Sequence, residues 1–208
     1  MSEAHGRFAH TTIDTFDVDR TLVGPVTWNQ AGFDPQTGTW TARTFSIEQQ
    51  RRSLHEAKAA AVQFSEQLSG GLYLCGPFGS GKTHLGSAIA GAIERQGWRT
   101  HYDSTPALLR HIRRGFDDHS ADERIEFLQN VQLLMLDDLG AEHLSNWGEA
   151  ILFDITNERY RFNRPVIITT NLLLAAISGR IASRLAEMCQ VVPVIACDHR
   201  LTGQQVRR

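Results

Sequence analysis

The sequence predicts an α/β protein whose mostly parallel sheet of five strands is covered by helices on both faces. Short apolar segments alternate with longer amphipathic ones from residue 71 to residue 196, which is the pattern of strand–helix–strand units. The segment Leu133–Leu136 is apolar throughout, as expected of a central strand buried on both sides. With 208 residues, the chain can fill one such domain but not two of ordinary size.

The first 45 residues differ in composition from the rest. Residues 1–45 are rich in Thr, Gly, Asp and Asn and show no helical or strand period, so we expect an irregular N-terminal arm that could include short β pieces. Its scattered aromatic residues indicate that the arm packs against another part of the molecule. From Ser46 a strong helix former begins, with Ser46 as its N-cap, and Gly70 and Gly71 end it.

The remaining elements follow in alternation over residues 71–208. We expect strands at residues 71–75, 98–103, 131–137, 165–170 and 191–196. Helices are expected to start near Lys82, Pro106, Asp122 and Asn146, and a last one should run from Arg180 to Met188. Thr105 is expected to cap the second of these, because Pro106 suits the first turn of a helix. Residues 46–208 should therefore form one domain.

The bulk properties limit the environment. The net charge is −2, so any contact with nucleic acid needs a local basic surface. Three cysteines without metal-type spacing indicate a reducing compartment. No segment approaches the ~20 continuous apolar residues of a membrane span, and the N-terminus lacks the apolar core of a secretory signal. We therefore expect a cytoplasmic protein without a membrane partner.

A phosphate-binding loop follows the first strand of the sheet. Residues 76–83 match G-x-x-x-x-G-K-[ST] at every fixed position, between an apolar strand and an amphipathic helix. In such a loop, glycines let backbone N–H groups turn toward phosphate oxygens, the lysine contacts the β- and γ-phosphates, and the hydroxyl binds Mg²⁺. The predicted ATP-binding residues are Gly76, Pro77, Phe78, Gly79, Ser80, Gly81, Lys82, Thr83 and the adjoining His84, with Thr83 as a ligand of Mg²⁺.

Two carboxylates end the strand at residues 131–137. Asp137 and Asp138 should face the phosphate loop, because parallel sheets place their sites beyond the C-terminal ends of the strands. In P-loop NTPases the first acid of such a strand holds Mg²⁺. We therefore expect Asp137 to be a second metal ligand, and Asp138 to orient or deprotonate the attacking water. A solvated turn is the alternative interpretation of the pair.

Polar residues later in the chain could complete the site. Asn171 follows the strand at residues 165–170, where an amide can contact water or the γ-phosphate, although such a residue is also typical of a turn. Arg180 and Arg184 are four residues apart, so both guanidiniums should lie on one helical face. On its own, such a pair most often marks a solvated or salt-bridged face.

Taken together, the motifs resemble a known group of proteins. GPFGSGKTHL, LLMLDDLG, NERYRFNRPVIITTNL and RIASRL occur in the order found in DnaC-type helicase loaders and IstB-type transposition ATPases of the AAA+ superfamily. The resemblance covers about residues 70–200 and implies a three-layer AAA+ ATPase domain with a minimal or absent C-terminal lid.

The resemblance also implies roles for individual residues. Asn171 matches sensor 1, and Arg184 matches an arginine finger that acts on the ATP of a neighbouring subunit, with Arg180 supporting that interface. Arg200 resembles a sensor-2-like arginine at the nucleotide. These roles imply self-association through the nucleotide site and weak ATP hydrolysis by the monomer.

The resemblance further implies binding of single-stranded DNA. The basic segment of a predicted helix, Arg110, Arg113 and Arg114, could follow a phosphate backbone, with Phe116 available for stacking on bases. A solvated helix face beside the acidic residues 117–123 explains the same pattern equally well.

Three functions remain open at this stage. The first is a loader that places a replicative helicase on DNA, using ATP and Mg²⁺. The second is a helper ATPase that coats DNA for a transposase. The third is an ATP-binding switch with negligible hydrolysis.

Overall fold

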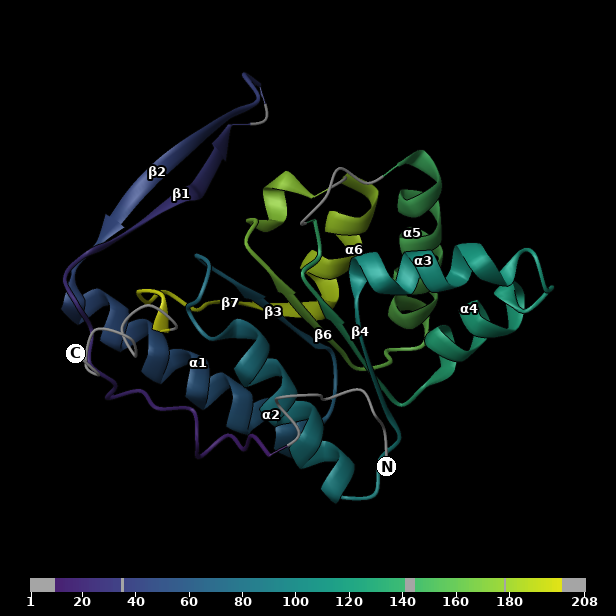
Figure 1. The fold of residues 1–208 in the computed structure, drawn as a ribbon, viewed down its shortest axis with the longest axis horizontal. Helices are drawn as coiled ribbons and strands as arrows, with labels where there is room; N and C mark the ends of the chain where they lie inside the picture. Colours follow the sequence, from purple (N-terminus) through teal and green to yellow (C-terminus); the bar gives the residue numbers. More distant parts are fainter. Residues whose placement is uncertain (1–9, 35, 141–144, 178, 200–208) are drawn as a thin grey trace.

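A five-stranded parallel sheet forms the middle layer of the molecule (Figure 1). The computed structural model describes residues 10–34, 36–140, 145–177 and 179–199. The strand order is β4-β5-β6-β3-β7, and every pair is parallel. The strands are β3 (Gly71–Cys75), β4 (Thr100–Ser104), β5 (Leu133–Asp137), β6 (Val166–Thr170) and β7 (Cys189–Pro193). The predicted parallel α/β fold is therefore confirmed.

The last strand lies earlier in the chain than the sequence predicts. We expected residues 191–196, but β7 begins at Cys189 and ends at Pro193. Its neighbour β3 reaches only to Cys75, opposite Pro193, and the chain then turns into the phosphate loop. Residues 194–196 continue the apolar run and are buried, and the Val194 N–H still donates to the carbonyl of Cys75, the last residue of β3.

One face of the sheet is covered by α1 (Ile47–Gln67) and α2 (Lys82–Arg95). Ser46 caps α1 as predicted. Its hydroxyl accepts a hydrogen bond from the Gln49 N–H, and its own N–H donates to the side-chain oxygen of Gln49. The apolar side chains of both helices pack on the strand residues that point to this face, namely Leu72, Leu74, Leu133, Met135, Ile167 and Val192. This alternation along each strand separates the two halves of the core.

The opposite face packs against α3 (Thr105–Gly115), α4 (Ala121–Asn130), α5 (Asn146–Arg161) and α6 (Gly179–Met188). A short 3₁₀ helix, η2 (Leu174–Ala176), precedes α6. The cap of α3 is Ser104 rather than the predicted Thr105, which is itself the first helical residue, immediately before Pro106. None of the helices in the described ranges is long and apolar enough to cross a membrane.

The N-terminal arm contains more regular structure than the sequence predicts. Strands β1 (Val26–Asp34) and β2 (Thr39–Phe45) form an antiparallel hairpin that extends from the body (Figure 1). Their register shifts between Trp28 and Gly32, and such a bulge breaks the alternation by which strands are identified in sequence. Residues before the hairpin run along α1 and α2, where the Lys58 ammonium donates to the carbonyls of Asp14 and Phe16.

The division into an arm of residues 1–45 and a domain of residues 46–208 stays a prediction. The expected minimal or absent lid concerns residues after β7, and 200–208 lie outside the described part of the chain.

A buried arginine joins the N-terminal ends of the strands β5 and β6. Arg159 of α5 is fully buried, and its guanidinium donates to five main-chain carbonyls. Those carbonyls belong to Leu128, Gln129, Val131, Gln132 and Pro165, at the end of α4 and just before β5 and β6. One side chain thereby satisfies the carbonyls that a helix end leaves without partners.

Replacing Arg159 with methionine should strongly destabilise the protein. The variant keeps much of the buried volume but leaves several buried carbonyls without donors, and we expect a loss of at least about 3 kcal/mol in the free energy of unfolding. Urea denaturation measures this loss. Arg161→Met is the matched control, because its side chain is 61% exposed and a surface ion pair contributes under about 1 kcal/mol. Equal midpoints for the two variants would contradict the assignment.

Candidate nucleotide-binding site

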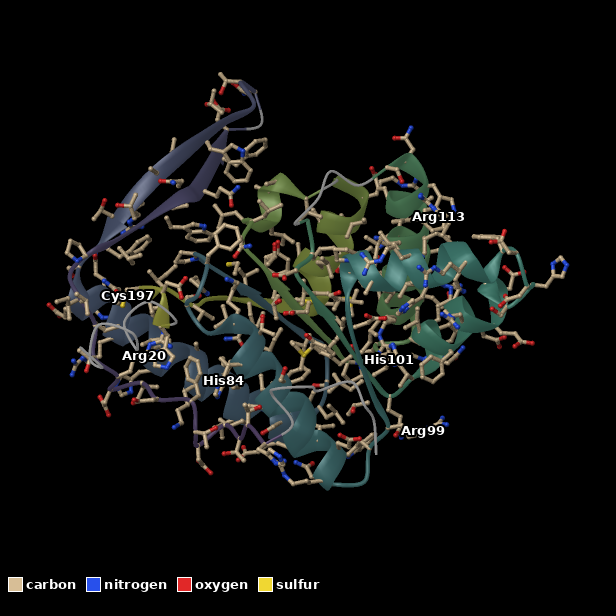
Figure 2. The ribbon with its side chains drawn as sticks, viewed as in Figure 1. Arg20, His84, Arg99, His101, Arg113 and Cys197 are labelled. Atoms are coloured by element: carbon tan, nitrogen blue, oxygen red, sulfur yellow. The ribbon has the colours of Figure 1, made fainter. Side chains whose placement is uncertain are left out.

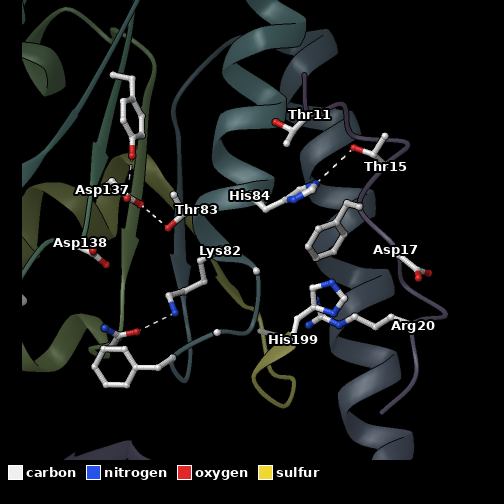
Figure 3. A pocket seen from close by; sticks show the side chains of 16 residues that line it. Thr11, Thr15, Asp17, Arg20, Lys82, Thr83, His84, Asp137, Asp138 and His199 are labelled. Atoms are coloured by element: carbon white, nitrogen blue, oxygen red, sulfur yellow. Dashed lines mark hydrogen bonds between the residues drawn. The ribbon is translucent and has the colours of Figure 1, made fainter. Parts of the chain in front are cut away.

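A cavity of about 720 Å³ opens at the C-terminal edge of the sheet (Figure 3). The phosphate loop, the ends of β4 and β5, the residue after β6 and the residues before the hairpin all contribute to its walls. Figure 3 shows Lys82, Thr83, Asp137 and Asp138 on one side of the cavity and Thr15, Asp17, Arg20 and His199 on the other. The cavity lies where a parallel sheet is expected to bind its ligand.

The phosphate loop depends on glycine at two positions. Gly79 has a φ of +71°, and a Cβ there would lie 2.1 Å from the carboxyl group of Asp198. Gly76 has a φ of +154°, and a Cβ there would lie 2.2 Å from the carbonyl oxygen of Val194. Both the backbone angle and the available space therefore exclude side chains, and the loop can approach a ligand with its main chain.

The ammonium of Lys82 lies inside the mouth of the loop. Its Nζ donates to the carbonyls of Gly76 at 3.0 Å and Pro77 at 2.8 Å, and to Oδ1 of Asn171 at 2.9 Å. Lys82 and Asn171 are 89 residues apart in sequence and both are buried, with 6% and 8% of their surface exposed. The structure thus brings together the predicted phosphate lysine and the predicted sensor amide.

The carboxylate of Asp137 meets three donors. The Thr83 hydroxyl lies 2.9 Å from Oδ1, the Thr169 hydroxyl donates to the same oxygen, and the Tyr102 hydroxyl lies 3.1 Å from Oδ2. A threonine hydroxyl and a carboxylate this close provide the hard oxygen ligands that Mg²⁺ takes. The predicted metal ligands Thr83 and Asp137 therefore fit that ion. Burial and the nearby Asp137 charge raise the pKa of Tyr102, so this hydroxyl remains a donor.

Asp138 has an unusual backbone conformation. Its φ is +54°, in the left-handed region that non-glycine residues rarely adopt, and its N–H donates to the Thr169 hydroxyl at 3.1 Å. Its side chain lines the cavity and is exposed. This conformation turns the chain immediately after β5 and leaves the Asp138 carboxylate at the edge of the cavity.

The residues before the hairpin form the far wall of the cavity, which sequence reasoning missed. Thr11, Thr15, Phe16, Asp17 and Arg20 all line it. The Arg20 guanidinium is buried and donates to the carbonyl of Ser80 in the phosphate loop at 2.7 Å. These residues belong to no motif and lie some 60 residues before the loop, so only the aromatic Phe16 hinted that this region packs.

His84 follows the phosphate loop and faces this wall. Its Nε2 lies 3.5 Å from the Thr15 hydroxyl, and its ring is 6.0 Å from that of Phe16. Burial, together with the nearby Arg20 and His199, lowers the pKa of His84, which favours the neutral imidazole. The wall therefore offers aromatic faces and hydrogen-bonding groups at the end of the cavity away from Asp137.

Other predicted site residues lie outside the cavity. Arg180 and Arg184, on α6, are absent from the described cavity lining and instead stack on rings of α5. The basic residues Arg110, Arg113 and Arg114 lie on the exposed face of α3. Arg200, the predicted sensor-2-like residue, lies outside the described residues.

Fold and site together define a P-loop NTPase with the AAA+ fold. Residues 41–201 match the model of the family described as IstB-like ATP binding protein. The chain therefore belongs to this family of ATP-binding proteins.

Curated relatives include both helicase loaders and insertion-sequence proteins. The replicative helicase loader DnaI of Bacillus subtilis is 28% identical over 102 residues, which are 49% of this chain and 33% of DnaI. The protein y4pL of Sinorhizobium fredii, named for an insertion sequence and for ATP binding, is 30% identical over 139 residues. That match covers 66% of this chain and 56% of y4pL. The chain thus spans between a third and about half of these relatives.

Solved structures share the fold. A crystal structure of DnaI is 27% identical with a TM-score of 0.61, covering 68% of this chain and 84% of that one. The DnaC helicase loader has a TM-score of 0.65 at 24% identity and covers 90% of this chain and 98% of its own. The AMPPCP-bound DnaA of Aquifex aeolicus has a TM-score of 0.64 at 20% identity, covering 89% of this chain and 50% of that one. These last two similarities concern the fold alone.

Removing the Lys82 ammonium should abolish tight nucleotide binding. Lys82→Ala leaves the triphosphate without its buried cation, and we expect the affinity for ATP to fall by roughly 100-fold or more. Isothermal titration calorimetry measures the change. Arg52→Ala, at an exposed position of α1, is the control and should bind as the wild type does. An unchanged affinity in Lys82→Ala would place the nucleotide elsewhere.

Proposed function

We propose that this protein is a Mg²⁺-dependent ATPase that acts as a helicase loader-like protein on single-stranded DNA. Two hydrogen-bonded pairs at one edge of the sheet, Lys82 with Asn171 and Thr83 with Asp137, carry the proposal. A cation, two metal-ligand oxygens and an amide are the groups that a triphosphate and its metal ion need.

Each residue has a distinct task in hydrolysis. Lys82 holds the β- and γ-phosphates, while Thr83 and Asp137 hold Mg²⁺, which neutralises the charge of the phosphates when bound. Asp138 orients the attacking water and accepts its proton, and Asn171 contacts the γ-phosphate or that water. The main-chain N–H groups of residues 78–83, which include the start of α2, bind phosphate oxygens.

The base of the nucleotide fits the far wall of the cavity. Phe16 and His84 offer ring faces there, and Thr15 offers a hydroxyl. The main chain of His199 donates to the Gly79 carbonyl at 3.2 Å, which fixes this residue beside the loop.

The arginines of α6 support self-association. The Arg184 guanidinium lies 4.8 Å from the centre of the Tyr160 ring, and its Nε donates to Oδ1 of Asn157 at 3.0 Å. The Arg180 guanidinium lies 4.0 Å from the centre of the Phe153 ring. Rings of α5 thus hold both side chains outside their own cavity, where they are available to the ATP of a neighbouring subunit. An arginine supplied by a neighbour makes hydrolysis conditional on assembly.

The relation to DnaI, whose name describes a replicative helicase loader, supports a helicase as the partner. A second candidate is a helper ATPase for a transposase, which the IstB-like family and the insertion-sequence relative favour. Co-purification with a hexameric helicase supports the loader, and stimulation of strand transfer by a transposase supports the helper.

Hydrolysis should depend on assembly through Arg184. We expect ATP turnover per subunit to rise with protein concentration and with single-stranded DNA. Arg184→Ala should bind ATP normally but hydrolyse it about 10³-fold more slowly. Steady-state phosphate release measures this, with the exposed Arg161→Ala as control. Equal turnover in Arg184→Ala would refute the trans arginine, and a flat, near-zero wild-type rate despite tight ATP binding would indicate a switch without hydrolysis.

A basic and aromatic surface on α3 and α5 is the proposed contact for DNA. The Arg113 guanidinium lies 4.7 Å from the centre of the Trp147 ring, and the Phe116 ring lies 6.1 Å from it. Phe116 is 50% exposed, so its ring is accessible to a base. In Figure 2, Arg113 lies at the end of the molecule opposite Arg20. Cations beside exposed rings suit a strand whose phosphates and bases both need contacts.

Charge reversal at Arg113 should weaken binding of single-stranded DNA. Arg113→Glu removes one phosphate contact and adds repulsion, so we expect an affinity loss of about tenfold at 50 mM salt and a shallower salt dependence. Fluorescence anisotropy with a labelled oligothymidine measures both. Arg161→Glu changes the charge equally at another exposed position and should bind as the wild type does. Identical curves for the two variants would leave this face as an ordinary solvated surface.

A further inference from the structure

A tryptophan of the hairpin is hydrogen-bonded to the main chain of a residue in the nucleotide site. Trp28 lies on β1, is 5% exposed, and packs in the core cluster together with Tyr73. Its indole N–H donates to the carbonyl oxygen of Asn171 at 3.1 Å. The two residues are 143 positions apart, so this bond joins the arm directly to the segment after β6.

Asn171 connects this bond to the phosphate lysine. Its carbonyl accepts the bond from Trp28, while its side-chain Oδ1 accepts the bond from Lys82 at 2.9 Å. A shift of the Asn171 main chain would therefore move the amide relative to the ammonium that meets the β- and γ-phosphates. Both Trp28 and Asn171 are buried, so if the Trp28 N–H were removed, water would not easily take its place as the donor to the Asn171 carbonyl.

The segment after β6 is anchored from two sides. The Tyr73 hydroxyl of β3 donates to the Leu172 carbonyl at 3.1 Å, and the Leu172 N–H donates to the Thr170 hydroxyl at 3.0 Å. These bonds come from the parallel sheet itself. The bond from Trp28 comes from the hairpin, which is a separate two-stranded sheet.

We propose that Trp28 is a positioning residue that holds the Asn171 amide ready for the γ-phosphate, so that the site prefers ATP to ADP. The inference rests on the proposed function, in which Asn171 contacts the γ-phosphate. An amide that is fixed before binding loses little conformational freedom when it makes that contact. ADP lacks the γ-phosphate and, of this pair, meets only Lys82, so we expect its affinity to depend much less on where the amide lies.

The test compares the affinities of the ATP analogue AMPPCP and of ADP for Trp28→Phe. Phenylalanine keeps an aromatic ring and removes the N–H. We expect AMPPCP to bind about three- to tenfold more weakly, the usual effect of one hydrogen bond, while the ADP affinity stays within about twofold. Trp40→Phe, on the same hairpin and 37% exposed, is the control and should change neither affinity. Equal weakening of both nucleotides in Trp28→Phe indicates a general structural role and overturns the proposal.

A double-mutant cycle with Asn171→Ala shows whether the effect passes through that residue. Asn171→Ala should lower the ratio of the AMPPCP and ADP affinities, and adding Trp28→Phe should lower it no further. Additive effects of the two substitutions would overturn the route. Wild-type protein that binds neither nucleotide would refute the proposed function. Normal binding by the wild type with an unchanged affinity ratio in Trp28→Phe would overturn only the role of Trp28.

If Trp28→Phe does not fold, the NMR resonance of the Trp28 indole N–H in the wild-type protein tests the proposal. The chain has four tryptophans, so the resonance can be assigned by elimination with Phe variants of Trp40, Trp98 and Trp147. We expect a shift with AMPPCP that is absent with ADP. The same shift with both nucleotides would overturn the proposal.

Discussion

The site depends on the hydrogen bonds that the buried carboxylate of Asp137 accepts. A carboxylate that is 5% exposed is tolerated only where donors replace its water, and here they come from Thr83, Tyr102 and Thr169. These donors belong to α2, β4 and β6, while Asp137 ends β5. One side chain thereby sets the position of the phosphate-loop helix relative to three strands. The same oxygens are the ones that a metal ion can use, so the interaction that aligns the strands also forms the proposed metal site.

Much of this site is predictable from sequence because its parts are local patterns. The loop at residues 76–83, the apolar strand before Asp137 and the position of Asn171 after a strand are each contained in a few consecutive residues. Local sequence does not show that these segments come together in space. The bond between Lys82 and Asn171 requires β6 to lie beside β3, and strand order has no local signal. The structure of the N-terminal arm is even less predictable from sequence. The bulge after Trp28 hides the strand period, and Arg20 contacts the loop across 60 residues without any motif.

The arginines show why charge patterns in a sequence leave function open. Arg159 lies on a helix next to Glu158, yet it is fully buried and donates to main-chain carbonyls just before β5 and β6. The i,i+4 spacing of Arg180 and Arg184 correctly indicated a shared face. Sequence did not show that this face lies on the rings of α5, which hold the guanidiniums in fixed places at low cost in solvation. A stacked arginine on the surface is better prepared for a partner's phosphate than a freely solvated one.

The N-terminal arm lines one wall of the cavity and is hydrogen-bonded to Asn171 on the other side, which connects the arm directly to the nucleotide-binding site. Phe16 and Arg20 line the wall opposite Asp137, and Trp28 holds the residue that meets Lys82. If Trp28 positions Asn171 for the γ-phosphate, linkage requires the reverse effect as well: ATP must favour the arrangement of the hairpin that keeps this bond. Any partner that binds the hairpin in that arrangement would then bind the ATP state more tightly than the ADP state. A hairpin outside the parallel sheet is well placed for such a role, because its two strands are hydrogen-bonded to each other and not to the strands that hold Asp137.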